Sequence, residues 1–142
     1  NMRTFTSTSP EQTKQIAAEF AKQLNGGEVV LLKGDLGAGK TTFVQGLVQA
    51  FGYDDPVLSP TFTLVNVYSC ARGSMKRIVH VDLYRLKDSS ELAPLALEEY
   101  LDDQSVLVIE WPELFAEQLK YPYTVIRVEE QNDLRQIIIT RL

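Results

Sequence analysis

The residues best suited to do chemistry lie between Gly34 and Thr41. They read Gly-Asp-Leu-Gly-Ala-Gly-Lys-Thr and fit the pattern G-x-x-x-x-G-K-[ST]. In such a loop, backbone N–H groups surround phosphate oxygens, the lysine reaches the β- and γ-phosphates, and the last hydroxyl ligates Mg²⁺. Lys40 and Thr41 would take those roles. The rest of the predicted nucleoside triphosphate site comprises Asp35, Leu36, Gly37, Ala38, Gly39 and Thr42.

The elements around this loop fit the same interpretation. Glu28–Lys33 is typical of a short buried strand, and Thr42–Phe51 is typical of a helix that Gly52 closes. A strand, a glycine loop and a helix in direct succession place the positive end of the helix dipole at the anion. The alternative is a tight strand-to-helix turn that merely uses glycines, and the unbroken context favours the phosphate site.

A second group of polar residues follows the strand pattern Ile78–Tyr84. Strand alternation puts His80, Asp82 and Tyr84 on one face, and valine and leucine on the other. Asp82 could hold Mg²⁺, which prefers oxygen ligands, and Arg85 could pair with a carboxylate or a phosphate. The alternative is a polar sheet face with a plain Asp82–Arg85 ion pair. For His80 alone, a structural and a chemical role stay equally open.

A third candidate is Glu110, which ends the continuously apolar segment Ser105–Ile109. Ligands collect at the carboxyl ends of parallel strands, so Glu110 could bind Mg²⁺ through water or orient an attacking water. It could instead cap a helix that begins near Pro112. Trp111 beside it either packs in the core or contacts the nucleotide or a partner.

The segment Ser59-Pro60-Thr61 is a candidate switch. A threonine hydroxyl there could sense the γ-phosphate and Mg²⁺, although a plain turn explains the same residues.

Bulk properties restrict the class of protein. The 142 residues are 44% hydrophobic and 23% charged, which suits one ordinary globular domain over residues 1–142. Asn1 before Met2 is expected to be a remnant of cloning. No apolar run is long enough to span a membrane. The single cysteine excludes an internal disulfide and suits a reducing cytoplasm.

The net charge of −5 argues against a domain that binds RNA or DNA by itself, because such domains usually carry a basic stripe that neutralises phosphates. If the function involves a nucleic acid, we expect a partner protein to make most of the contacts with it.

Further elements must position these groups. Ser9 and Pro10 predict a helix start, and Asn25-Gly26-Gly27 its end. Strands are predicted over 62–68, 76–83, 123–129 and 134–140, with short helical pieces near 94–101. Alternating strands and helices predict an α/β fold: a three-layer, P-loop NTPase-like domain with a mixed, largely parallel central sheet.

Four linked motifs resemble the TsaE (YjeE) family of bacterial ATPases. They are G-D-L-G-A-G-K-T-T, S-P-T-F-T-L, H-V-D-L-Y-R-L and I-E-W-P-E, in this order between about Leu31 and Glu113. One departure is Ala96, where the family tends to carry glycine, which affects the expected local loop geometry.

This resemblance implies a role in making N6-threonylcarbamoyladenosine (t6A) beside the tRNA anticodon. TsaE-like proteins bind and hydrolyse Mg-ATP while docked on the TsaD–TsaB heterodimer, and tRNA is held by the complex. By position, Gly39, Lys40 and Thr41 would bind phosphate and Mg²⁺, and Thr61 would be the switch threonine. The resemblance makes Asp82 the metal-side acid and Glu110 the second acid. Four further residues match the family's motifs without a defined role: His80, Tyr84, Arg85 and Trp111.

Two other functions remain open at this point. One is a small-molecule kinase, which would need an acceptor pocket and an arginine-rich lid, although arginine is scarce between Thr41 and Tyr84. The other is an ATP-gated binding module in which hydrolysis is incidental. No glutamine or arginine finger is obvious in the sequence, so we expect slow hydrolysis by the chain alone.

Overall fold

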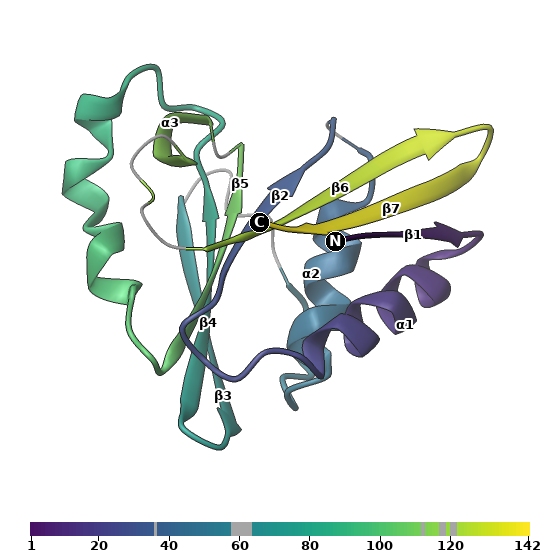
Figure 1. Cartoon of the computed structure of the whole chain (residues 1–142), viewed down its shortest axis with the longest axis horizontal. Helices are drawn as coiled ribbons and strands as arrows, with labels where there is room; N and C mark the ends of the chain where they lie inside the picture. The colour runs from purple at the N-terminus through teal and green to yellow at the C-terminus, as the bar shows by residue number, and fades with distance from the viewer. Residues whose placement is uncertain (36, 58–63, 112, 117–118, 120–121) are drawn as a thin grey trace.

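The computed structural model describes residues 1–35, 37–57, 64–111, 113–116, 119 and 122–142. Within this part, a seven-stranded sheet runs through the molecule in the order β1-β7-β6-β2-β5-β4-β3 (Figure 1). Its strands are β1 Met2–Ser7, β2 Val29–Lys33, β3 Val65–Arg72, β4 Met75–Asp82, β5 Ser105–Glu110, β6 Thr124–Gln131 and β7 Leu134–Arg141.

Helices cover both faces of the sheet, so the predicted three-layer α/β architecture is confirmed (Figure 1). Helices α1 (Pro10–Ala21) and α2 (Lys40–Gln49) lie on one face. The other face carries α3 (Glu113–Ala116) and three short 3-10 helices: η1 (Ser89–Glu91), η2 (Ala93–Leu95) and η3 (Leu97–Tyr100). Each layer buries its own apolar cluster against the strands between them.

The two long helices pack at very close range. A Cβ atom on Gly46 of α2 would lie only 2.5 Å from Cα of Lys14 in α1. Glycine is therefore required where the helices cross, because any side chain would push their backbones apart. The start of α1 is as predicted, since the Ser9 hydroxyl accepts a hydrogen bond from the backbone N–H of Gln12 at 3.1 Å.

The mixed sheet is confirmed, and its parallel part consists of the four central strands. β6, β2, β5 and β4 pair in parallel, whereas β3, β7 and β1 are added in antiparallel fashion. In the register, Glu110 of β5 lies beside Leu32 of β2 on one side and beside Asp82 of β4 on the other. The carboxyl ends of these three strands therefore meet at one edge of the sheet, next to the glycine-rich loop.

The N-terminal strand was not predicted from the sequence. Residues Met2–Ser7 form β1, an edge strand that pairs along its whole length with β7. Most of its side chains are exposed, so the segment lacks the apolar alternation that identifies a half-buried strand. The β6–β7 hairpin was predicted, and its turn holds Asn132 and Asp133 at positive φ, as a tight hairpin turn requires.

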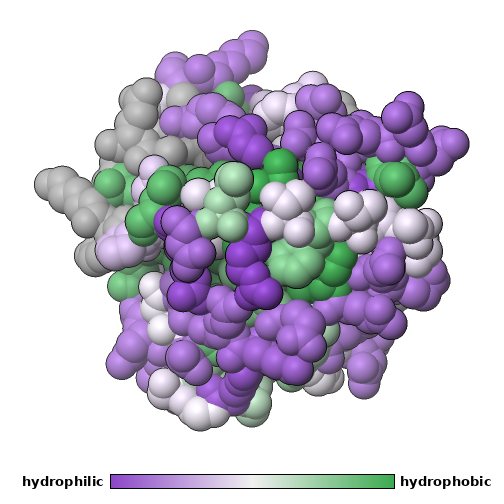
Figure 2. All heavy atoms as spheres, turned by 45° about the vertical axis from the view of Figure 1, so that its right-hand side comes forward, coloured by the Kyte–Doolittle hydropathy of each residue, from purple (hydrophilic) through white to green (hydrophobic). Residues whose placement is uncertain are grey.

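No helix in the described ranges is both long and apolar enough to cross a bilayer. The side of the molecule seen in Figure 2 is mostly hydrophilic around a central hydrophobic area.

Candidate functional site

The glycine-rich loop connects β2 to α2 and depends on glycine for its shape. Gly37 and Gly39 have φ angles of 81° and 107°, in the region that favours glycine. A Cβ atom on Gly34 would lie 2.5 Å from the carbonyl oxygen of Val128. Gly39 provides the N-cap of α2, and no side chain in the described part of the chain caps this end. The first N–H groups of α2 are thus available to an anion.

Lys40 is the first residue of α2 and is buried, with 6% of its surface exposed. Its Nζ lies 3.4 Å from Oε1 of Glu110 and 4.4 Å from the centre of the Trp111 ring. A cation held between a carboxylate and an aromatic face is stabilised by both. The loop lysine therefore already has an internal anionic partner.

The carboxylate of Glu110 is held from two sides. Its Oε2 atom is 2.5 Å from Nε2 of His80, a fully buried side chain on the neighbouring strand β4. Burial raises the pKa of Glu110, but the His80 hydrogen bond and the charges of His80 and Lys40 lower it more. The net pKa is below the ordinary value, so Glu110 carries its negative charge at neutral pH.

Asp82 ends β4 and lies beside Glu110 in the register. Its side chain is 5% exposed, and its Oδ1 atom accepts a hydrogen bond from the backbone N–H of Tyr84 at 2.9 Å. His80 and Asp82 thus share the α2 side of the sheet, as the alternation predicted, but they are buried and do not form an exposed polar face. Tyr84 lies beyond the end of the strand and is 49% exposed.

The oxygen atoms of Asp82, Glu110 and Thr41 are a donor set that suits Mg²⁺. Mg²⁺ usually keeps several waters and takes one or two carboxylates together with substrate phosphates. No group of three or more His, Cys, Asp or Glu side chains that could hold a metal occurs in the part of the chain that the structure describes. Two carboxylates and a hydroxyl beside a phosphate loop match this pattern of Mg²⁺ coordination.

Trp111 covers the site. It follows Glu110 directly, has a positive φ of 54°, and packs against Tyr84 with ring centres 4.9 Å apart and ring planes tilted by 48°. A tryptophan in this backbone region is strained, and such strain often occurs at functional sites. Its partly exposed ring contacts Lys40, which favours a place at the nucleotide site over a place in the core.

Of the predicted site residues, the structure brings together Lys40, His80, Asp82, Tyr84, Glu110 and Trp111. Arg85 follows Tyr84 and is exposed. Leu36 and Thr61 lie outside the described residues, so the switch segment remains a prediction.

One residue near the loop was missed by the sequence reasoning. Arg135 of β7 places its Nε atom 3.5 Å from the position that a Cβ on Gly39 would occupy. Both residues line a hollow of about 150 Å³ whose other walls are Ser7, Thr8, Ser9, Pro10, Thr13, Thr42 and Asp133. No local pattern marks Arg135, because the β6–β7 hairpin brings it to the loop from far along the sequence.

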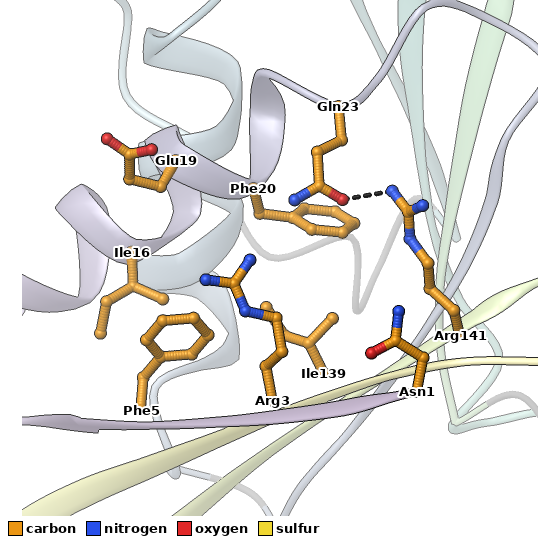
Figure 3. Close-up of a pocket in the computed structure, with 9 residues that line it drawn as sticks. All are labelled: Asn1, Arg3, Phe5, Ile16, Glu19, Phe20, Gln23, Ile139 and Arg141. Atoms are coloured by element: carbon orange, nitrogen blue, oxygen red, sulfur yellow. Dashed lines mark hydrogen bonds between the residues drawn. The ribbon is translucent and has the colours of Figure 1, made fainter.

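Among the larger hollows in the described part, two are similar in volume. One, of about 560 Å³, lies on the other side of the loop and includes Gly34, Trp111 and Arg127. The second, of about 540 Å³, lies between the C-terminal half of α1 and the β1–β7 edge, where Phe5 and Phe20 form part of an apolar floor (Figure 3). It contains no residue of the glycine-rich loop, so it is separate from the candidate site.

Comparison with known proteins gives the family. A family model described as "Threonylcarbamoyl adenosine biosynthesis protein TsaE" matches residues 7–138. The chain belongs to the TsaE family. The resemblance seen in the sequence motifs is thereby confirmed.

Several TsaE relatives are similar over most of the chain. A protein of Bacillus subtilis named "tRNA threonylcarbamoyladenosine biosynthesis protein TsaE" is 40% identical over 133 residues, which are 93% of this chain and 81% of that protein. A TsaE of Aquifex aeolicus is 43% identical over 107 residues, 74% of this chain and 73% of that protein. The crystal structure of YdiB from Bacillus subtilis matches with a TM-score of 0.77 and 32% identity, covering 99% of this chain and 86% of that one.

Proposed function

We propose that this chain is a Mg-ATP hydrolase that supports t6A formation on tRNA while docked on a TsaD–TsaB-like partner complex. The observation that carries the chemical part is the buried contact of Lys40 with Glu110, which is itself held by His80, at the mouth of the glycine-rich loop. Membership of the TsaE family and the names of the relatives support the t6A part.

The phosphate end of the nucleotide would lie along the loop and the first turn of α2. The backbone N–H groups there face outward from the helix terminus, and Lys40 would exchange Glu110 for phosphate oxygens. Thr41, Asp82 and Glu110 would hold Mg²⁺ through their oxygen atoms. When bound, Mg²⁺ neutralises charge on the phosphates.

The nucleoside end would take the opposite side of the loop. The two acids lie on β4 and β5, whereas Thr42 and Arg135 lie toward β7 and line a hollow of about 150 Å³. Because the terminal phosphate belongs beside the acids, the base and ribose must leave the loop toward Thr42. The guanidinium of Arg135 could stack on a base or pair with a phosphate.

Hydrolysis would use water as the nucleophile, oriented by the ionised carboxylate of Glu110. Among the described residues, no arginine or glutamine contacts Lys40 or Glu110. We therefore expect slow turnover by the chain alone and faster turnover on the partner, which would supply the missing group or close the site.

The test measures ADP release and t6A formation by the purified chain with and without TsaD–TsaB. Turnover by the chain alone at about 10 per second, near the typical enzyme value, would contradict partner activation. Lys40→Ala should abolish both activities. Glu110→Ala should retain docking but fail to sustain t6A formation; if it sustained t6A formation, hydrolysis would be incidental to a binding module.

A test for a kinase uses the same protein. Transfer of phosphate to an added metabolite in preference to water would overturn the hydrolase assignment.

A further inference from the structure

The imidazole of His80 is a buried polar group whose purpose the proposed hydrolysis does not yet explain. It lies two residues before the carboxyl end of β4, is 0% exposed, and faces the apolar layer beneath α2. Its Nε2 atom is 2.5 Å from Oε2 of Glu110. Its Nδ1 atom has no hydrogen-bond partner in the part of the chain that the structure describes. The ring therefore has one polar contact, and that contact goes to the carboxylate beside the loop.

The two carboxylate oxygen atoms of Glu110 contact different residues. Oε1 faces Lys40 at 3.4 Å, and Oε2 faces His80. A carboxylate only accepts hydrogen bonds, so Nε2 of His80 is the donor. If Lys40 turns to the phosphates, Oε1 loses its partner. His80 is then the one described side chain that still fixes the orientation of Glu110.

We propose that His80 is a positioning residue: its Nε2–H holds Oε2 of Glu110, so that Oε1 stays directed at the phosphate site once Lys40 binds the nucleotide. This inference rests on the proposed hydrolysis at Glu110. Hydrogen bonds from outer residues orient the carboxylates of metal and catalytic sites, and their loss typically costs 10–100-fold in affinity or activity. An apolar side chain at position 80 would leave Oε2 buried without this donor.

The substitutions His80→Gln and His80→Asn form a matched pair. Each amide nitrogen replaces a different nitrogen of the imidazole ring. The amide nitrogen of glutamine reaches about as far as Nε2, whereas that of asparagine reaches about as far as Nδ1. His80→Gln can therefore still donate to Glu110, and His80→Asn cannot. We expect His80→Gln to keep kcat within about threefold of the parent on the partner complex. His80→Asn should lose about 10–100-fold in kcat, with little change in KM or in the Kd for ADP.

The variant Ser105→Ala tests whether a lower stability of the protein is enough to reduce kcat. Ser105 is buried at the opposite end of β5, where its hydroxyl accepts a hydrogen bond from Nε of Arg77 at 2.7 Å. This substitution destabilises the same strand without touching Glu110. Equal losses in the glutamine and asparagine variants would overturn the proposal. So would no loss in either, a loss confined to KM, or a loss that Ser105→Ala reproduces at the same thermal stability.

A second measurement does not depend on hydrolysis. Trp111 is the single tryptophan of the chain and follows Glu110 directly. With ADP bound, when Lys40 has turned to the phosphates, its fluorescence should shift in His80→Asn, where Glu110 has lost both partners, and match the parent in His80→Gln. If the parent fails to hydrolyse ATP even on the partner, the proposed function falls. The fluorescence comparison then still decides whether His80 holds Glu110, and identical spectra in the two variants would refute that role.

Discussion

Replacing the carboxylate of Glu110 by an amide should make the protein bind ADP more tightly in the absence of Mg²⁺. Lys40 and Glu110 are buried partners 3.4 Å apart, so a nucleotide must compete with Glu110 for the lysine. Coulomb's law with an effective dielectric constant of about 20 gives about 5 kcal/mol for two charges at the 3.4 Å separation. Desolvation of the two ions offsets much of this energy. We therefore expect a net gain of about 1.4 kcal/mol in Glu110→Gln, or about tenfold in Kd.

The assay is ADP titration in EDTA, followed by calorimetry or by the fluorescence of Trp111. EDTA is needed because Glu110 is also a proposed Mg²⁺ ligand, and with Mg²⁺ the gain should shrink while hydrolysis is lost. Glu113→Gln is the matched control, since Glu113 is an exposed carboxylate beside the loop with no ion pair to Lys40 among the described residues. Unchanged or weaker Mg-free binding in Glu110→Gln would refute competition between the carboxylate and the nucleotide.

Three further predictions concern stability, each measured by urea or thermal unfolding. Ala96 has a left-handed backbone with φ of 51°, so Ala96→Gly should stabilise the fold by about 0.5–1 kcal/mol, whereas Ala93→Gly in η2 should destabilise it. Gly46→Ala gains about 1 kcal/mol of helix propensity, but its Cβ would lie 2.5 Å from Cα of Lys14, so a net loss of about 1–2 kcal/mol is expected; a gain would contradict the tight helix crossing. Burial raises the pKa of Asp102, but hydrogen bonds from Gln104 and Ser105 and the nearby guanidinium of Arg77 lower it more. The net pKa of Asp102 is therefore below its ordinary value. This partly exposed carboxylate therefore stabilises the fold when it is ionised. Asp102→Asn should lower the free energy of unfolding by less than about 1 kcal/mol at pH 7. This loss should disappear as the pH falls below about 3.9, because the carboxylate is then protonated. A cost that persists at low pH would contradict this origin.

The loop and its flanking elements were predictable because their signals are local. Glycines at fixed spacing, a buried strand before them and a helix after them specify the phosphate loop within the segment Glu28–Phe51. Asp82 was predictable from the alternation along its strand, and Glu110 was predictable because it follows a continuously apolar segment, where ligands collect in parallel sheets. Their side-by-side placement comes from the register of β4 and β5, which neither local pattern specifies.

Other features depend on contacts between distant segments and have no local signal. The hydrogen bond of His80 to Glu110 requires β4 and β5 to be neighbours in a specific register. Arg135 reaches Gly39 only through the β6–β7 hairpin. The edge strand β1 carries mostly exposed side chains, so backbone pairing with β7, and not apolar alternation, decides its structure.

The pairing of the first strand with the last has a consequence for how the chain folds during synthesis. β1 leaves the ribosome before the other strands of the sheet, and its partner β7 emerges after them. Contacts between β1 and β7 form late because closing so long a loop costs entropy. Helices α1 and α2 are close in sequence and can associate while β1 still has an open edge. The charged Arg3 on that strand then protects it, since charge on an open edge discourages pairing with other chains. Premature termination before β7 would leave β1 without a partner, and β6 would pair only with β2 and have its other edge open. Such a fragment is an expected target for aggregation and proteolysis.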